Sequence, residues 1–419
     1  MKAVRSFLQV FQSRKMAALL FLGFSSGLPR GLISQTLPSW LTVEKVDLEA
    51  IGYFGLVGSP YFLKFLWSPF LDRFVPPFLG RRRGWLAITQ VALLIAIAIM
   101  SLQNPTQGLQ LLAVNALLIA FLGATQDIAA DAYRTDVLDT LEMGAGAGVF
   151  VLGYQVALSV AWVAFGLADS LTWPTVYLFI SLLMLFGLFS AIFAPEPKTE
   201  SPPESLDAAV VQPFLEFFSR KGQWKALLIL VFIVLYKLGD ALVNNMSTPF
   251  LLQTGFSQGN IGDIQGGMGI LAKIVGTLSG GALLSKIGIN RSLWVFGILQ
   301  AVSNLAYFVL AQVGKDYSAL VLTINIENFC AGLGTAAFVA FLMSLCNQQF
   351  SATQYALLSS LMTVSRDILA APAGKLALIT GWPNFFLIST IAALPGLLLL
   401  PVFAPWNAVL ESADSEDQN

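Results

Sequence analysis

The sequence predicts an all-α integral membrane protein whose twelve transmembrane helices form two pseudo-symmetric bundles of six. Of its 419 residues, 56% are hydrophobic and only 11% are charged, whereas soluble domains carry about 25% charged residues. A bilayer core about 30 Å thick requires roughly 20 apolar residues per helix, and such stretches recur along the chain. Apolar length, the distribution of positive charge and an internal repeat together lead to this prediction.

The apolar stretches end at polar, turn-forming or aromatic residues. Five tryptophans, Trp40, Trp85, Trp173, Trp224 and Trp382, mark predicted ends, because an indole ring is stabilised between hydrocarbon and water. The first stretch is long and interrupted by Gly and Pro, so we interpret it as a mature helix and not as a signal peptide. The predicted spans are 16–40, 50–71, 84–103, 110–134, 145–168, 173–194, 225–251, 261–285, 292–313, 319–345, 354–379 and 384–403.

Positive charge is distributed unevenly between the two sides of the predicted membrane. Fifteen Lys and Arg residues flank the spans on the side of the N-terminus, whereas only Lys45 and Lys315 flank them on the other side. The positive-inside rule therefore places both termini in the cytoplasm.

The chain resembles itself at an offset near 210 residues, as expected of a duplicated six-helix unit. The matched features are Pro38 with Pro249, Trp85 with Trp294, Trp173-Pro174 with Trp382-Pro383, and Phe193-Ala194-Pro195 with Phe403-Ala404-Pro405. The predicted parts are an N-terminal bundle over 1–194, a cytoplasmic linker over 195–223 with an amphipathic helix near 208–220, a C-terminal bundle over 224–405 and an acidic cytoplasmic tail over 406–419.

Several classes of function are excluded by composition. The chain contains no histidine, so Ser/His/Asp and Cys/His catalysis are not expected, and neither a metal site nor a cofactor is predicted. Cys330 and Cys346 lie in one predicted helix about 24 Å apart, too far for a disulfide. A net charge of −1 argues against a nucleic-acid partner. We therefore do not expect an enzyme.

Ionisable residues remain inside the predicted spans, where each costs several kcal/mol unless it faces water or a partner. With the repeat offset, Lys64 falls one residue from Lys273, so we expect the two lysines to be symmetry-related and to face one central cavity. The surplus of positive charge favours an anionic substrate. The basic residues near span midpoints are Arg30, Lys64, Lys237, Lys273 and Arg366, and the acidic residues at comparable depth are Asp127, Asp240, Glu327 and Asp367.

Two spans carry charges in informative spacings. Asp127, Asp131 and Arg134 share one face of the fourth span, and two carboxyls on one face favour keeping one of them protonated, as a proton carrier requires. Asp127 is the deeper candidate, whereas Asp131 and Arg134 suit a structural or gating ion pair. In the seventh span Lys237 and Asp240 are one turn apart, which fits an internal ion pair as well as substrate contact.

The loop after the second span reads SPFLDRFVPPFLGRRRGW. It resembles the signature loop of the major facilitator superfamily, in which acidic and basic residues clamp the cytoplasmic side, although Ser68 stands where glycine is common and the insert before the basic run is longer. The resemblance implies the major facilitator fold. The gating residues expected from this loop and the fourth span are Asp72, Arg73, Arg81, Arg82, Arg83 and Arg134.

Further motifs in order along the chain, FLKFLWSPFLDR, ATQDIAADAYRTDVL, LYKLGDA, ENFCAGLGTAAFVAF and SATQYALLS, resemble the AmpG muropeptide permease family. The resemblance covers essentially the whole chain. It implies a monomer in the bacterial inner membrane that imports anhydro-muropeptides (GlcNAc-1,6-anhydro-MurNAc and its peptides) from the periplasm, driven by protons. This import supplies peptidoglycan recycling and the signal that induces β-lactamase.

A muropeptide carries carboxylates, which basic residues can hold, and sugars, which amide and aromatic side chains can hold. Two alternatives remain open, namely transport of another organic anion, such as acetyl-CoA or a peptide, and a sensor that binds muropeptide without moving it. The candidate substrate-binding residues are Arg30, Tyr61, Lys64, Gln126, Tyr154, Gln155, Lys237, Asp240, Asn244, Lys273, Asn328 and Arg366, and the candidates for proton coupling are Asp127, Asp131 and Glu327.

Overall fold

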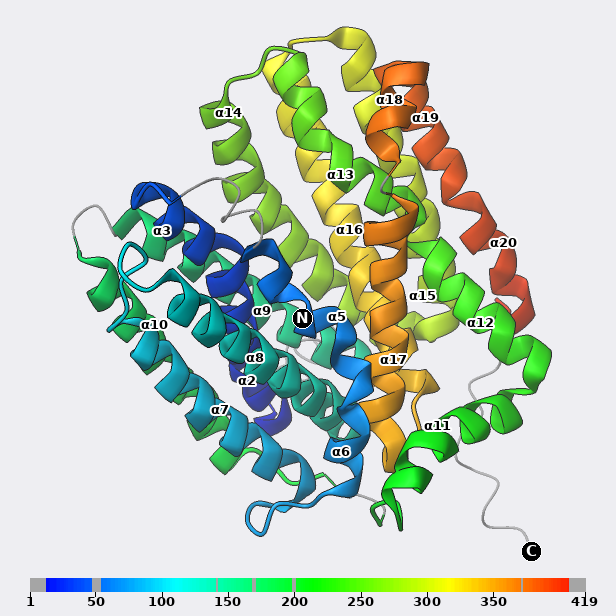
Figure 1. The fold of residues 1–419 in the computed structure, drawn as a ribbon. Helices are drawn as coiled ribbons and strands as arrows, with labels where there is room; N and C mark the ends of the chain where they lie inside the picture. The colour runs from blue at the N-terminus through cyan, green and yellow to red at the C-terminus, as the bar shows by residue number, and fades with distance from the viewer. Residues whose placement is uncertain are drawn as a thin grey trace, which may run out of the picture. The chain divides into compact units, whose positions relative to one another are not determined.

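The computed structural model describes residues 13–46, 54–140, 142–167, 171–197, 201–370 and 372–406. All regular elements in these ranges are helices, and the ranges contain no strand (Figure 1). Within them, nine helices are long and apolar enough to cross a membrane, and shorter apolar helices accompany them. The predicted all-α membrane fold is therefore confirmed.

The contacts between residues divide the chain into two compact units. Unit 1 consists of residues 1–220 together with 342–360, and unit 2 consists of 221–341 together with 361–419. The two predicted bundles are, in contrast, continuous stretches of chain that are separated by the linker over 195–223. Residues 342–360 group with unit 1 because they are hydrogen-bonded to α11 (Leu206–Lys221), which lies where the linker helix is predicted, and to side chains at the ends of α6, α7 and α8.

Unit 1 supplies the first six spans. α2 begins after Ser13, whose hydroxyl oxygen accepts a hydrogen bond from the Met16 amide at 3.2 Å, as an N-cap should. Pro60 and Pro69 each stand in the first turn of a short helix and interrupt the second span. Its helices are α2 (Arg14–Gly31), η2 (Leu32–Thr36), α3 (Leu37–Val43), η3 (Gly55–Gly58), α5 (Pro60–Leu63), η4 (Lys64–Leu66), α6 (Ser68–Arg73), α7 (Gly80–Met100), α8 (Leu109–Val137), α9 (Met143–Leu167) and α10 (Trp173–Phe193).

The helices α2 and α9 pack at backbone distance. A Cβ atom on Gly23 would overlap with the carbonyl oxygen of Phe150, and one on Gly153 would overlap with that of Leu20. Small residues allow such close approach between transmembrane helices, where no hydrophobic effect drives association. Together α2, α7, α8, α9 and α10 form one bundle, with α2 against α9 and α7 between α8 and α10 (Figure 1).

Unit 2 supplies most of the second half. The long α15 contains a kink at Gly288, whose φ of 80° suits glycine, so it accounts for two predicted spans. The last two spans are each built from shorter helices. The elements are α12 (Gln223–Tyr236), α13 (Leu238–Gln253), α14 (Gln258–Asp263), η5 (Ile264–Gly269), α15 (Ile270–Val313), α16 (Tyr317–Leu345), η6 (Gln348–Phe350), α17 (Ser351–Thr363), η7 (Val364–Leu369), α18 (Ala373–Thr380), α19 (Trp382–Ala392) and α20 (Leu394–Phe403). The end of α16, η6 and the first residues of α17 belong to unit 1.

Candidate functional site

A buried charge network in unit 1 is centred on Arg82. Its guanidinium Nη2 lies 2.9 Å from Oδ1 of Asp72, and its Nε lies 2.7 Å from Oδ2 of Asp136. The same Nη2 donates to the hydroxyl of Ser351 at 2.6 Å. The side chain of Arg82 is only 1% exposed, so two carboxylates and a hydroxyl replace the water that this cation would otherwise require.

Asp72 also caps the N-terminus of α17. Its Oδ2 accepts hydrogen bonds from the amide and the hydroxyl of Thr353, at 2.8 and 2.7 Å, and its Oδ1 accepts one from the amide of Ala352 at 3.3 Å. The first amides of a helix have no partner within the helix and carry partial positive charge. A carboxylate is therefore well suited to this position, and it joins the end of α6 to residues 351–353.

The remaining predicted gating residues of the loop have different partners. Arg81 donates to the carbonyl oxygens of Gln348 and Gln349, at 3.1 and 3.4 Å. Arg83 donates to carbonyl oxygens in the last turn of α10 and lies 3.7 Å from Glu196, as suits a cation at a helix C-terminus. Arg73 lies over the ring of Phe74 and forms no ion pair in the described part of the chain.

A second cluster joins α8 to Lys64 and to α17. Asp131 bridges two cations, with Oδ2 lying 3.2 Å from Lys64 Nζ and Oδ1 lying 2.9 Å from Arg134 Nη2. Arg134 also donates to the hydroxyl of Tyr355 at 2.6 Å and stacks over the ring of Phe150. The pairing of Asp131 with Arg134 that the spacing predicts is present, and Lys64 completes it.

Asp127 lies one turn from this cluster. Its Oδ1 is buried and accepts no hydrogen bond from the described residues, and its charge interacts with those of Lys64, Asp131 and Arg30. The guanidinium of Arg30 stacks over the ring of Tyr61 at 4.6 Å. The structure thus gathers several of the predicted substrate and proton residues of the first half.

Three other predicted substrate-binding residues of unit 1 lie on α8 and α9. Gln126 is fully buried and donates weakly to the hydroxyls of Ser25 and Ser26, at 3.3 and 3.4 Å, so it joins α8 to α2. Tyr154 and Gln155 are half-buried on α9.

In unit 2, Lys237 lies at a break between α12 and α13. Its backbone is not helical, with φ −100° and ψ 3°, and its Nζ lies 2.9 Å from Oδ2 of Asp240 in the first turn of α13. The buried Glu327 interacts electrostatically with Lys237, Asp240 and Lys273. Residues near the middle of the second half thus form a charge cluster of their own.

The amide groups predicted for sugar binding in unit 2 are anchored to their own helices. Asn244 donates to the carbonyl of Asp240 at 2.8 Å, and Asn328 donates to that of Ile324 at 2.9 Å. Both bonds leave the side-chain oxygens facing away from these carbonyls. The side chain of Arg366 lies outside the described part of the chain, although its backbone belongs to η7.

Sequence reasoning missed the partners of the gating residues. Asp136, Ser351, Thr353 and Tyr355 complete the networks around Asp72, Arg82 and Arg134. The motif SATQYALLS contains three of them, and Asp136 lies two residues after Arg134. Proximity in sequence to known charges was therefore the available signal for Asp136.

A third network attaches the linker helix α11 to the same segment. Glu216 accepts hydrogen bonds from Arg220 Nε at 2.6 Å, from Gln354 Nε2 at 2.7 Å and from Asn347 Nδ2 at 3.2 Å. Burial alone would raise the pKa of Glu216, but these hydrogen bonds outweigh it and lower that pKa below its usual value. Arg220 also donates to the Leu345 carbonyl at 2.6 Å.

Comparison with known proteins decides the family. A model of the Major Facilitator Superfamily matches residues 19–373. The anhydromuropeptide permease of Escherichia coli strain K12 is 47% identical over 400 residues, which cover 94% of this chain and 81% of the relative. The chain belongs to the AmpG family of the major facilitator superfamily. The predicted resemblance is confirmed.

Solved structures support the fold of this AmpG-family protein. The human organic anion transporter MFSD10 (TETRAN) matches with a TM-score of 0.67 at 16% identity, covering 94% of this chain and 99% of that one. The proton:xylose symporter XylE matches with a TM-score of 0.66 at 11% identity, covering 96% of each chain. The major facilitator fold is thus confirmed. The family consists of permeases, so this AmpG-family chain is a multi-pass membrane transporter and not an enzyme.

Proposed function

We propose that this protein imports anhydro-muropeptides from the periplasm to the cytoplasm across the bacterial inner membrane, with both termini cytoplasmic. The observation that carries the proposal is 47% identity to an anhydromuropeptide permease over 94% of the chain. The cargo is GlcNAc-1,6-anhydro-MurNAc and its peptides. It feeds peptidoglycan recycling and supplies the signal that induces β-lactamase, and the protein acts as a monomer.

The substrate carboxylates are held by cations inside each bundle. In unit 1, Tyr61 fixes the plane of the Arg30 guanidinium, which presents its N–H groups for bidentate binding of a carboxylate. Lys64 is 9% exposed and already paired with Asp131, so a substrate carboxylate would compete for it. Lys237 and Lys273 in unit 2 offer the same chemistry.

Proton coupling is assigned to Asp127, with Asp131 and Glu327 as the other candidates. Asp131 already forms ion pairs with two cations, Lys64 and Arg134. The buried Oδ1 of Asp127 accepts no hydrogen bond from the described residues, so this oxygen is open to a proton, and the carboxyl lies among the charges of Lys64, Asp131 and Arg30. Movement of Lys64 from Asp131 to a substrate carboxylate would change the charge that Asp127 faces, and would thereby couple proton uptake to binding.

Gating is assigned to the network around Asp72, Arg82 and Asp136, and to Arg134. Alternating access requires the two bundles of the repeat to move as bodies. The capped end of α17 is held by Asp72 and Arg82. Opening on the cytoplasmic side must therefore separate residues 351–353 from Asp72 and Arg82. Arg81 contributes through the carbonyls of residues 348 and 349.

The substrate class is tested by uptake into right-side-out membrane vesicles from cells that lack their own permease. Labelled GlcNAc-anhydro-MurNAc-peptide should accumulate, and unlabelled muropeptide should compete whereas acetyl-CoA and the free peptide should not. If acetyl-CoA or the free peptide competes instead, the substrate is another organic anion and not a muropeptide. Tight binding in detergent without accumulation in vesicles would favour a sensor.

A further inference from the structure

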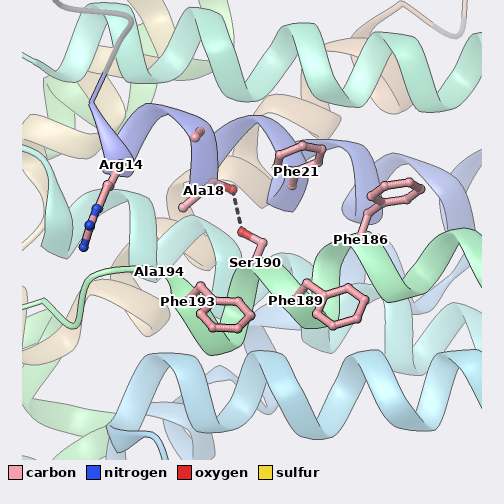
Figure 2. Close-up of a pocket in the computed structure, with 9 residues that line it drawn as sticks. Arg14, Ala18, Phe21, Phe186, Phe189, Ser190, Phe193 and Ala194 are labelled. Carbon is pink, nitrogen blue, oxygen red and sulfur yellow. Dashed lines mark hydrogen bonds between the residues drawn. The ribbon is translucent and has the colours of Figure 1, made fainter.

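A groove between α2 and α10 of unit 1 is not used by the proposed transport mechanism. It has a volume of about 520 Å³. Figure 2 shows Phe21 and Phe186 toward one end, Phe189 and Phe193 along one side, and Arg14 at the other end, near Ala194. The groove is therefore apolar along its length and positively charged at one end.

Apart from Arg14 at its end, the groove lining offers an apolar occupant no unsatisfied polar group to desolvate. The hydroxyl of Ser190, in the groove, is satisfied by the carbonyl of Ala18 at 3.0 Å. Phe21 and Phe186 stack with ring centroids 5.9 Å apart and form a wall. Phe193 is 76% exposed and Phe189 is 57% exposed. Aromatic surface on this scale would be covered by hydrocarbon in a membrane.

The charge at the groove end is available for a ligand. The neighbouring Lys15 is engaged by Asp139 and Glu142, at 3.3 and 2.8 Å. Arg14 is exposed, and none of the acidic side chains in the described ranges pairs with it. Arg14 also belongs to the side on which Lys and Arg are concentrated, where anionic headgroups are recognised by basic residues.

The repeat shows that two of the residues lining this groove have counterparts of a different kind or environment in unit 2. The counterpart of Phe193 in unit 2 is Phe403, which packs edge-on against Phe232 at 4.7 Å and stacks on Phe341 at 5.8 Å. Phe403 is therefore partly buried against its own bundle, whereas Phe193 is largely exposed. At the same offset, Trp224 takes the place of Arg14. Position 224 therefore lacks the cation that lies at the end of the groove in unit 1.

We propose that the groove binds an anionic phospholipid, with one acyl chain along the aromatic wall and the phosphate on Arg14. The unpaired guanidinium complements a phosphodiester in geometry and charge, and an extended acyl chain is narrow enough to enter. A transmembrane helix is about 10 Å wide, so it would cover the groove without filling it. A neutral lipid would leave Arg14 without a counter-charge.

The test is photo-crosslinking in phosphatidylcholine nanodiscs that contain a trace of photoactivatable phosphatidylglycerol or of the matched phosphatidylcholine probe. The wild type should be labelled by the anionic probe on α2 and α10. Arg14→Gln should lower that labelling about fivefold, as expected for the loss of one cation near a headgroup, and Ala17→Phe, which fills the groove, should lower it as well. Lys225→Gln, at an exposed lysine next to the counterpart position in unit 2, should leave it unchanged.

Three outcomes would overturn the proposal. Equal labelling of α2 and α10 by both probes would show ordinary lipid contact without headgroup recognition. Labelling that persists in both Arg14→Gln and Ala17→Phe would place the lipid elsewhere. Protection of the groove by a second protein would show a protein interface. Muropeptide uptake by the same variants shows that they are folded, and an absence of muropeptide uptake in the wild type would refute the transport proposal while leaving the labelling result intact.

Discussion

At the scale of single residues, Arg82 is a buried cation of unit 1 that forms two ion pairs and a hydrogen bond to a hydroxyl. Asp72, Asp136 and Ser351 all bind its guanidinium, which is almost completely buried. Removal of one partner from a buried ion pair leaves the others unpaired and costs about 3–5 kcal/mol. The contribution of Arg82 to the stability of the folded protein therefore depends on its ion-pair partners more than on its own charge.

Arg82→Gln should lower the thermal unfolding midpoint of the purified protein clearly, because two buried carboxylates lose their counter-ion. Arg73→Gln is the matched control, since Arg73 belongs to the same loop and is half-buried without an ion pair in the described ranges. Unfolding followed by tryptophan fluorescence checks the difference. Equal midpoints for the two variants would contradict a stabilising role for the Arg82 network.

The carboxyl of Glu216 gives a prediction about pH. Because its pKa is lowered in the folded protein, its contacts stabilise the attachment of α11 above the usual glutamate pKa of 4.5, and this stabilisation is lost as the pH falls through the folded pKa. The protection factors of the α11 amides, which correct the exchange rates for the pH dependence of intrinsic exchange, should therefore fall below a pH of about 4.5. Glu216→Gln should already exchange faster at neutral pH and lose this acid response, and an unchanged response in the variant would disprove the assignment.

At the scale of helices, the close approach of α2 and α9 depends on glycine. A Cβ on Gly153 would overlap with the backbone of α2, whereas a Cβ on Gly266 in η5 would meet nothing within 4 Å. Gly153→Ala should therefore force the two helices apart at a cost of about 1–3 kcal/mol, and Gly266→Ala should be nearly neutral. Thermal unfolding and substrate uptake of the two variants provide the measurement, and a neutral Gly153→Ala would show that the contact relaxes freely.

The helices also show which features of the fold could be predicted from the sequence. Apolar length located the spans, because a membrane imposes the same length on each of them. It could not show that Pro60 and Pro69 divide the second span or that the chain breaks at Lys237. Such breaks depend on local backbone geometry, to which mean hydropathy is insensitive.

The candidate site was predictable only in part for a related reason. The pairing of Asp131 with Arg134 follows from helical spacing, which is a local property. The contacts of Asp72 with Thr353 and of Arg82 with Ser351 join residues that lie about 270 to 280 positions apart, and no periodicity in one sequence can reveal them. Motif resemblance identified both segments without saying that they touch.

At the scale of the whole molecule, the repeat and the distribution of charge bear on the mechanism together. Each half carries cations inside its bundle, with Lys64 in unit 1 and Lys273 in unit 2 one residue out of register at the repeat offset. Each half also carries a carboxyl among those cations, Asp127 or Glu327. The proposed mechanism uses these charges, with substrate carboxylates and protons exchanging for the internal ion pairs.

The measurement that tests this account most directly is gradient-driven accumulation of labelled GlcNAc-anhydro-MurNAc-peptide in right-side-out vesicles. An imposed inward proton gradient should drive accumulation by the wild type. Asp127→Asn should abolish the accumulation yet retain binding of the substrate, and Asp263→Asn, at an exposed carboxyl of α14, should behave as the wild type. Equal wild-type uptake with and without the proton gradient, or full accumulation by Asp127→Asn, would contradict proton-driven import through Asp127.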